Sequence, residues 1–256
     1  MSAEAHVEIF GLPGIPQVRA GDDIATLILD ALHRAGLLLR NGDVVVVTQK
    51  IVSKAEGCTY DLNSVTPSDA AIEVAQATGK DPRLVEVILG QSRQIIRQRE
   101  GTLITETLHG WICANAGVDR SNVYGPEGDI ALALPTDPDA SAARIRERLM
   151  AATGVDLAVL ITDTHGRPWR LGTVNVSIGA AGISPITDLR GQADMVGYTL
   201  RITTVARADE LAAAAGLVMG QAAEKLPVVV IRGAGYVGGE GKATDLQRSK
   251  AKDLFR

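Results

Sequence analysis

The stretch VNVSIGAAGI at residues 174–183 decides the fold class, together with YTLRITTVA at residues 198–206. Both runs are rich in apolar and β-branched residues, which is typical of strands, and no helical pattern lies between them. A doubly wound parallel sheet alternates strands and helices strictly. Two successive strands without a helix therefore favour an α+β fold with mixed or antiparallel sheets.

The rest of the chain predicts further strands and helices around this pair. Apolar runs bounded by turn residues predict strands at 6–11, 43–49, 102–107, 130–134, 156–162 and 226–233. Apolar residues at helical spacing predict helices at 22–36, 67–79, 81–92, 139–154 and 207–224. The tail after Gly233 is glycine-rich and then charged, and we expect it to form a mobile loop.

Composition excludes several classes of protein. The 256 residues suffice for one large domain or two small ones, and 46% are hydrophobic, so a sizeable core can be buried. A net charge of −4 leaves no basic footprint for nucleic acid. Two cysteines do not make a disulfide framework, and no run of about 18 apolar residues exists to span a membrane. With no signal-peptide pattern at the N-terminus, we expect a soluble cytoplasmic protein.

The segment ITDTHGRPWR at 161–170 is the main candidate for chemistry. It puts Asp163 and Thr164 at the carboxyl end of a predicted buried strand, where α/β and α+β proteins often place ligands. Mg²⁺ uses one or two carboxylates with phosphate and water oxygens, and Asp119 could supply the second carboxylate. Arg167 and Arg170 could neutralise phosphate or carboxylate charge.

Two alternatives stay open for this segment on its residues alone. An apolar strand followed by Asp-x-Asp is the pattern of the haloacid-dehalogenase nucleophile, which would make the protein a metal-dependent phosphatase, but His165 stands in place of the second acid. Asp163 could also simply cap a turn, with solvated arginines beside it.

Other motifs are weaker. Gly233-x-Gly235-x-x-Gly238 matches the dinucleotide fingerprint in letters, but no apolar helix follows it, so we reject that motif. Lys50 and Lys54 follow a predicted strand, where lysines commonly protect a sheet edge.

Taken together, several stretches resemble the coenzyme F420-0:γ-glutamyl ligase family, in family order and over nearly the whole chain. They include GIPQVRAGDDI (14–24), GDVVVVTQKIVSKAEG (42–57), AGVDRSNV (116–123), ITDTHGRPWRLG (161–172) and DLRGQADMVGYTLRITTVARADELAAAAGLVMG (188–220). The resemblance implies a single ligase domain over residues 1–256, built from two intertwined α+β subdomains, without a fused flavin-binding domain, in a homodimer.

The activity that this resemblance implies is an amide ligation in coenzyme F420 biosynthesis. The family joins L-glutamate to the lactyl carboxylate of F420-0 at the expense of GTP, and then adds a γ-linked glutamate. An acyl phosphate is the intermediate, and GDP and phosphate are released. The implied cofactors are two divalent ions, Mg²⁺ or Mn²⁺, with K⁺ as an aid.

The resemblance also implies roles for individual residues. Its metal ligands match Asp119, Asp163, Thr164 and, on the C-terminal loop, Glu240. Its GTP contacts match Ile15, Pro16, Gln17, Val18, Gln49, Lys54 and Asn122. Our candidates for clamps on phosphate or carboxylate are Arg167, Arg170 and Arg190, with Asp194 as a further substrate contact.

Overall fold

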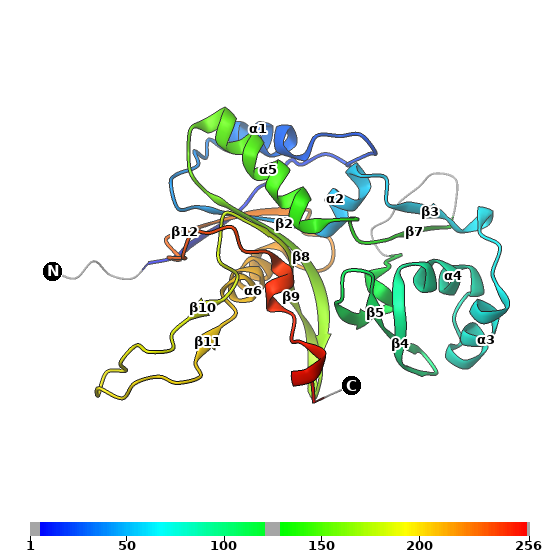
Figure 1. The fold of residues 1–256 in the computed structure, drawn as a ribbon. Helices are drawn as coiled ribbons and strands as arrows, with labels where there is room; N and C mark the ends of the chain where they lie inside the picture. The colour runs from blue at the N-terminus through cyan, green and yellow to red at the C-terminus, as the bar shows by residue number, and fades with distance from the viewer. Residues whose placement is uncertain (1–5, 121–128, 255–256) are drawn as a thin grey trace.

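A mixed five-stranded sheet forms the centre of the protein (Figure 1). The structure is a computed structural model that describes residues 6–120 and 129–254. The strand order is β1 (Glu8–Gly11), β12 (Val228–Arg232), β2 (Val44–Thr48), β8 (Ala158–Arg167) and β9 (Arg170–Ala181). Only β2 and β8 run parallel, and the other three pairs are antiparallel. The predicted α+β class is therefore confirmed.

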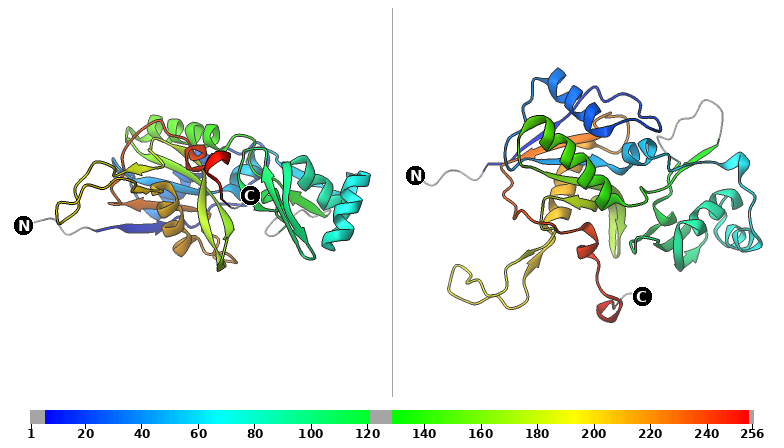
Figure 2. Two further views of the ribbon diagram at one scale, coloured as in Figure 1. Left: turned by 60° about the horizontal axis from the view of Figure 1, so that its bottom comes forward. Right: turned by 45° about the horizontal axis from the view of Figure 1, so that its top comes forward.

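Helices cover both faces of this sheet, as Figure 2 shows from two sides. One face packs on α1 (Ile24–Ala35) and α5 (Pro138–Thr153), and the other packs on α6 (Arg207–Met219). Successive side chains of a strand point to opposite faces, so Val45 joins the first core and Val46 the second. A strand buried on both sides must be apolar throughout, which explains the run VVVV in β2.

A second, smaller group of elements has its own core, and lies beside the sheet in Figure 1. It contains β3 (Thr59–Asp61), β7 (Ile130–Leu132), α3 (Asp69–Thr78), α4 (Pro82–Gly90) and the three-stranded sheet of β4 (Ser92–Arg99), β5 (Thr102–Thr107) and β6 (Ile112–Ala114). The short helix α2 (Gln49–Ala55) leads from β2 into this group. Leu62, Val85, Ile88 and Leu103 are buried in its core.

The segment after β9 forms an arm that projects from the body (Figures 1 and 2). Its only paired strands are β10 (Thr187–Asp188) and β11 (Thr204–Val205). The strand predicted over 198–206 is therefore wrong for most of its length. Ile202 and Tyr198 are exposed on the arm. An apolar run with no sheet to join within its own chain does not become a long strand.

The C-terminal tail differs from the mobile loop expected of it. The backbone N–H of Ala243 donates to Asp139 of α5 at 2.8 Å, and the Gln247 side chain donates to the carbonyl of His109 at 2.9 Å. Lys250 then lies 3.5 Å from Glu106 of β5. These contacts, around the 3₁₀ turns Ala243–Leu246 and Lys250–Lys252, tie the tail to both the sheet and the smaller group. Among the described residues, no helix has the length and apolarity needed to cross a bilayer.

Candidate functional site

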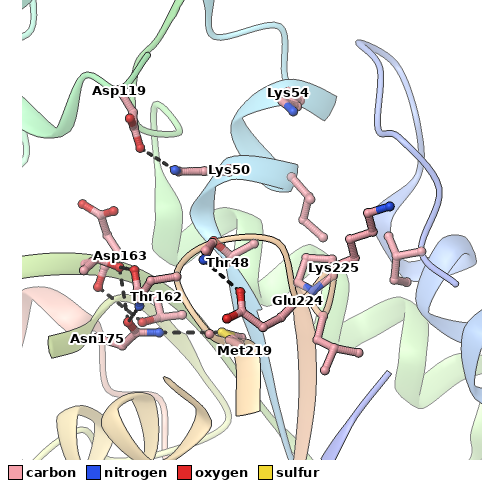
Figure 3. A pocket seen from close by; sticks show the side chains of 18 of the residues that line it. Thr48, Lys50, Lys54, Asp119, Thr162, Asp163, Asn175, Met219, Glu224 and Lys225 are labelled. Carbon is pink, nitrogen blue, oxygen red and sulfur yellow. Dashed lines mark hydrogen bonds and ion pairs between the residues drawn. The ribbon is translucent and has the colours of Figure 1, made fainter. Parts of the chain in front are cut away.

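A pocket of about 690 Å³ opens at one edge of the central sheet, where the smaller group meets it (Figure 3). The parallel pairing of β2 with β8 ends at this edge, with Thr48 opposite Thr162. The remaining walls come from the loop before α1, from α2, and from the loop between α6 and β12. Segments far apart in sequence therefore meet at the carboxyl end of β2, where its parallel pairing with β8 stops, and ligands commonly bind at such positions.

Asp163 and Thr164 line this pocket, but they do not end their strand. β8 continues to Arg167 and returns as β9, with Arg167 opposite Arg170. The strand stops being buried after Thr162, so Asp163 marks where β8 leaves the core rather than where it turns. The structure therefore corrects the prediction that the strand ends at residue 162. It also gives no support to a dehalogenase-type or simple capping role, because a hairpin strand continues through the acid.

Amide side chains hold Thr164 in place. The Thr164 hydroxyl lies 3.0 Å from Oε1 of Gln221, to which it can donate, and Nε2 of Gln221 donates to Oδ1 of Asn175 at 2.8 Å. Asn175 faces Thr164 across the β8–β9 ladder, whereas Gln221 comes from the loop after α6. This network presents several neutral oxygen donors next to the Asp163 carboxylate.

Asp119 reaches the same pocket from the smaller group and forms an ion pair with Lys50. The distance from Lys50 Nζ to Asp119 Oδ2 is 2.6 Å (Figure 3). Asp119 is fixed by two backbone hydrogen bonds to Leu132, both 2.9 Å long. Lys54 lies one turn further along α2, and burial and the charge of Lys50 lower its pKa. Two lysines and two carboxylates thus share one pocket.

His165 supports Asp163 from the same strand. Its Nε2 lies 3.2 Å from Oδ2 of Asp163. Burial by itself lowers the pKa of His165, but Asp163 and the nearby Cys113 outweigh that effect and raise the pKa to about 10. The imidazolium form thus offsets the charge of Asp163.

The residues that the family resemblance implies as GTP contacts fall into three groups according to their place in the structure. Lys54 lines the pocket, as do three residues of the loop before α1, namely Ile15, Pro16 and Gln17. Val18 instead packs into the main core, and Gln49 is buried, with its Oε1 accepting from Ser53 at 2.8 Å. Asn122 lies outside the described residues. The contacts with GTP stay a prediction for all of these positions.

Several predicted residues lie away from the pocket. Glu240 lines a separate pocket of about 600 Å³ together with Asp139. Arg190 pairs with Asp188 on the arm, and Asp194 accepts from two backbone N–H groups in a turn of the arm. The structure does not bring these three side chains to the site within one chain.

Sequence reasoning missed part of the pocket wall. The loop at 219–227 lines it with Gln221, Glu224 and Lys225, and β9 adds Asn175. Lys50 was interpreted only as an edge lysine. The polar run GQAAEK between an alanine-rich helix and a buried strand was the signal available in the sequence.

The donor set fits a divalent cation of the Mg²⁺ type. Within residues 6–120 and 129–254, no three His, Cys, Asp or Glu side chains cluster as a preformed metal site. Asp119, Asp163, Thr164 and Gln221 nevertheless supply carboxylate and neutral oxygens to one pocket. Mg²⁺ commonly binds one or two carboxylates and completes its shell with water and substrate phosphate, so these residues suit it.

Fold and pocket together define an α+β protein with a site of carboxylates, amides and lysines at a sheet edge. The family model described as F420-0:gamma-glutamyl ligase matches residues 14–233. The chain therefore belongs to the F420-0:γ-glutamyl ligase family, as the sequence resemblance implied, and it is an enzyme of the ligase class.

Curated relatives match over nearly their whole length. The coenzyme F420:L-glutamate ligase of Methanothermobacter thermautotrophicus is 50% identical over 98% of this chain and 99% of its own. The proteins of the same name from Methanocaldococcus jannaschii and Archaeoglobus fulgidus are 43% and 38% identical, each over 98% of this chain and 97% of theirs.

Proposed function

We propose that this chain joins L-glutamate to the terminal carboxylate of coenzyme F420-0, and then adds a γ-linked glutamate, with GTP converted to GDP and phosphate. The observation that carries the proposal is the meeting of Asp119 and Asp163 with Lys50 and Lys54 in one pocket. A nucleoside triphosphate binds together with divalent cations, so its site needs positive side chains for the phosphates next to carboxylates for the cations. The proposal includes two Mg²⁺ or Mn²⁺ ions and K⁺ as an aid.

The reaction has two bond-forming steps. A carboxylate oxygen of F420-0 attacks the γ-phosphorus of GTP, and the bond to the β–γ bridging oxygen breaks, so that GDP leaves and an acyl phosphate forms. The glutamate nitrogen then attacks the acyl carbon. Phosphate departs with the electron pair of the C–O bond, and the nitrogen gives up one proton. Activation is needed because a free carboxylate is a poor acyl donor.

The residues of the pocket have distinct roles in this proposal. Asp119, Asp163 and Thr164 would hold the divalent ions, which supply charge compensation for the phosphates when bound. Lys50 and Lys54 bind phosphate oxygens. Burial and the charge of Lys50 lower the pKa of Lys54, and a bound polyanion would raise this pKa again and so favour the ammonium form that binds phosphate.

The proposal also includes a homodimer, and the arm supports it. Met195 and Ile202 are 98% and 87% exposed on a segment that projects from the body. Exposed apolar residues gathered on such an extension are typical of an interface. Sedimentation velocity on the purified protein tests this, and a monomer at micromolar concentration would contradict it.

Mass spectrometry tests the ligation. Purified protein is incubated with F420-0, glutamate, GTP and Mn²⁺, and we expect products heavier by one and then two glutamate residues, together with GDP. GDP without a heavier coenzyme would refute the ligase, and equal turnover with ATP would refute the choice of GTP.

A substitution links this activity to the pocket. Asp163→Asn keeps the size of the side chain and an oxygen toward His165 but removes the metal-binding charge. We expect it to abolish ligation while the protein still folds, with a lower melting temperature because the His165 imidazolium loses its charge partner. Asp30→Asn, on the exposed side of α1, is the matched control and should keep full activity. Full activity in Asp163→Asn would remove Asp163 from the mechanism.

A further inference from the structure

Asn175 of β9 is a buried polar side chain in the wall of the pocket. It is 6% exposed and packs against α6, where its Nδ2 lies 3.7 Å from Sδ of Met219 (Figure 3). The helix accommodates it with a glycine, because a Cβ at Gly216 would lie 3.1 Å from Cγ of Asn175. Glycine inside a helix weakens it relative to alanine, and a buried amide is less favourable than an apolar side chain unless it is hydrogen-bonded. Asn175 therefore calls for a role beyond packing.

The oxygen of this amide receives donors from two residues of the pocket. Nε2 of Gln221 donates to Oδ1 of Asn175 at 2.8 Å, and the Thr164 hydroxyl oxygen lies 3.2 Å from the same atom. An amide oxygen has two lone pairs, so it can accept from both. The amide nitrogen instead faces the thioether of Met219, which is a weak acceptor. The strong hydrogen bonds of Asn175 are therefore directed at Thr164 and Gln221.

These contacts fix the orientation of both amides. If Asn175 were reversed, its NH₂ group would face the NH₂ group of Gln221, and two donors would oppose each other. If Gln221 were reversed, its oxygen would face Oδ1 of Asn175, and two acceptors would oppose each other. Nε2 of Gln221 therefore points back to Asn175, and its Oε1 is the atom beside Thr164, 3.0 Å from the hydroxyl oxygen.

The Thr164 hydroxyl has one proton and two acceptors within reach. Its oxygen lies 3.0 Å from Oε1 of Gln221 and 3.2 Å from Oδ1 of Asn175, and it can donate to one of them at a time. A proton directed at Oε1 occupies the oxygen that a cation would need. A proton directed at Oδ1 leaves Oε1 and the lone pairs of Thr164 to a cation beside Asp163. Asn175 supplies this second acceptor.

We infer that Asn175 is a positioning residue for the divalent cation of the pocket. It accepts the Thr164 proton and an N–H of Gln221, so that the oxygens of these two side chains are left to the cation. Asn175 acts through them and does not touch the cation itself. The inference rests on the divalent cation of the proposed function, and it adds a residue behind the metal ligands. Hydrogen-bond partners of metal ligands commonly change metal affinity by roughly 10–100-fold when they are replaced.

Binding of Mn²⁺ tests the inference without catalysis. Electron paramagnetic resonance reports the free ion in a titration of the whole chain without nucleotide or coenzyme. Asn175→Leu, which keeps a similar volume but has no acceptor, should raise the Kd for Mn²⁺ about tenfold. Asn175→Ala removes the same oxygen without adding bulk and should raise the Kd at least about threefold, so the test does not depend on the fit of leucine. Met219→Leu is the matched control, because it alters the same buried contact and leaves Oδ1 in place, and its Kd should stay within about twofold of wild type.

A double-mutant cycle tests whether Asn175 acts through Thr164. Thr164→Val removes the hydroxyl and keeps the shape of the side chain. With no hydroxyl proton to redirect, Asn175→Leu should raise the Kd for Mn²⁺ less than about threefold in this background, so the effects of the two substitutions are not additive. A purely structural role of Asn175 would give the same loss of affinity with and without the hydroxyl.

The inference and the proposed function can fail separately. A Kd within about twofold of wild type in both Asn175 variants would overturn the inference, as would an equal loss of affinity in Met219→Leu or in the Thr164→Val background. Failure of the wild type to bind Mn²⁺ would overturn it as well. If Mn²⁺ binding depends on Asn175 as expected but no glutamylated product forms, the proposed function fails and the inference stands. If the product forms and the Asn175 variants bind Mn²⁺ like the wild type, the inference fails and the proposed function stands.

Discussion

Replacing Lys50 by methionine should tighten the binding of a divalent cation in the absence of nucleotide. Lys50 holds Asp119 at 2.6 Å, so a cation that binds Asp119 must first displace the ammonium. The methionine keeps most of the aliphatic stem of Lys50 and removes only its charge. The change in metal affinity of this variant therefore measures how strongly Lys50 competes with the cation for Asp119.

The strength of the pair sets the expected size of the effect. At 2.6 Å, the attraction between unit charges is roughly 1.6 kcal/mol in bulk water and roughly 6 kcal/mol at an effective dielectric constant near 20. The two side chains are 24% and 30% exposed, so water screens much of this attraction. Ordering the lysine costs up to about 2 kcal/mol, which leaves a net of about 1 kcal/mol. That corresponds to about a fivefold lower Kd.

Titration with Mn²⁺, followed by electron paramagnetic resonance of the free ion, measures this Kd directly. Lys54→Met is the control, because it removes the same charge from the same helix one turn away (Figure 3). Its effect on the free energy of Mn²⁺ binding should be less than half the effect of Lys50→Met. An unchanged or higher Kd for Mn²⁺ in Lys50→Met would refute the competition between metal and ammonium.

Two further predictions concern stability. Asp139→Ala should cost about 1–3 kcal/mol in unfolding free energy, because two backbone N–H groups lose their acceptor, whereas Asp139→Asn keeps the oxygen. Burial raises the pKa of Asp139, so the native state holds this proton more tightly than the unfolded chain. The unfolding free energy of the wild type, measured in urea and compared with that of Asp139→Asn, should therefore fall as pH rises from below about 3.9 through the raised pKa of Asp139. A rise in this relative stability over the same pH range would contradict the prediction. Gly179→Ala would place a Cβ 2.4 Å from the Pro138 carbonyl oxygen and should cost about 1–3 kcal/mol, seen as a lower melting temperature. Gly90→Ala, with open space around it, should leave the melting temperature unchanged or higher.

The sequence predicted most of the central sheet because its strands are buried. The runs in β2, β8 and β12 are apolar on both faces, and only a sheet covered by helices on both sides accounts for them. The helix α1 was equally readable, since Asp23 caps its start and Gly36 ends it in the left-handed conformation.

The elements that failed lack this burial. β4, with the sequence SRQIIRQR, is mostly exposed and shows no apolar alternation, so nothing in it predicted a strand. The run at 198–206 fails for the opposite reason, because it is apolar in sequence but Tyr198 and Ile202 are exposed on the arm. The local pattern of apolar residues indicates a tendency to be buried, whereas the tertiary fold determines which segments pair with a neighbouring strand.

The site was predictable only in part. Asp119 and Asp163 share a pocket, which the family pattern implied and their own spacing could not. Gln221 and Lys50 were missed as site residues because periodicity does not tell which loops meet at a sheet edge. Glu240 lies in a different pocket of the same chain, and its role stays a prediction.

The order of strands in the central sheet has a consequence for synthesis on the ribosome. β12 lies between β1 and β2, so the first strand made is paired only by one that comes about 220 residues later. At 5–20 residues per second, that delay is roughly 10 to 40 s. Until β12 is made, β1 has no neighbouring strand in the sheet, and one edge of β2 stays open. Chaperones that shield nascent strands should therefore raise the yield of native protein more than they would for a fold whose neighbouring strands follow one another in the chain.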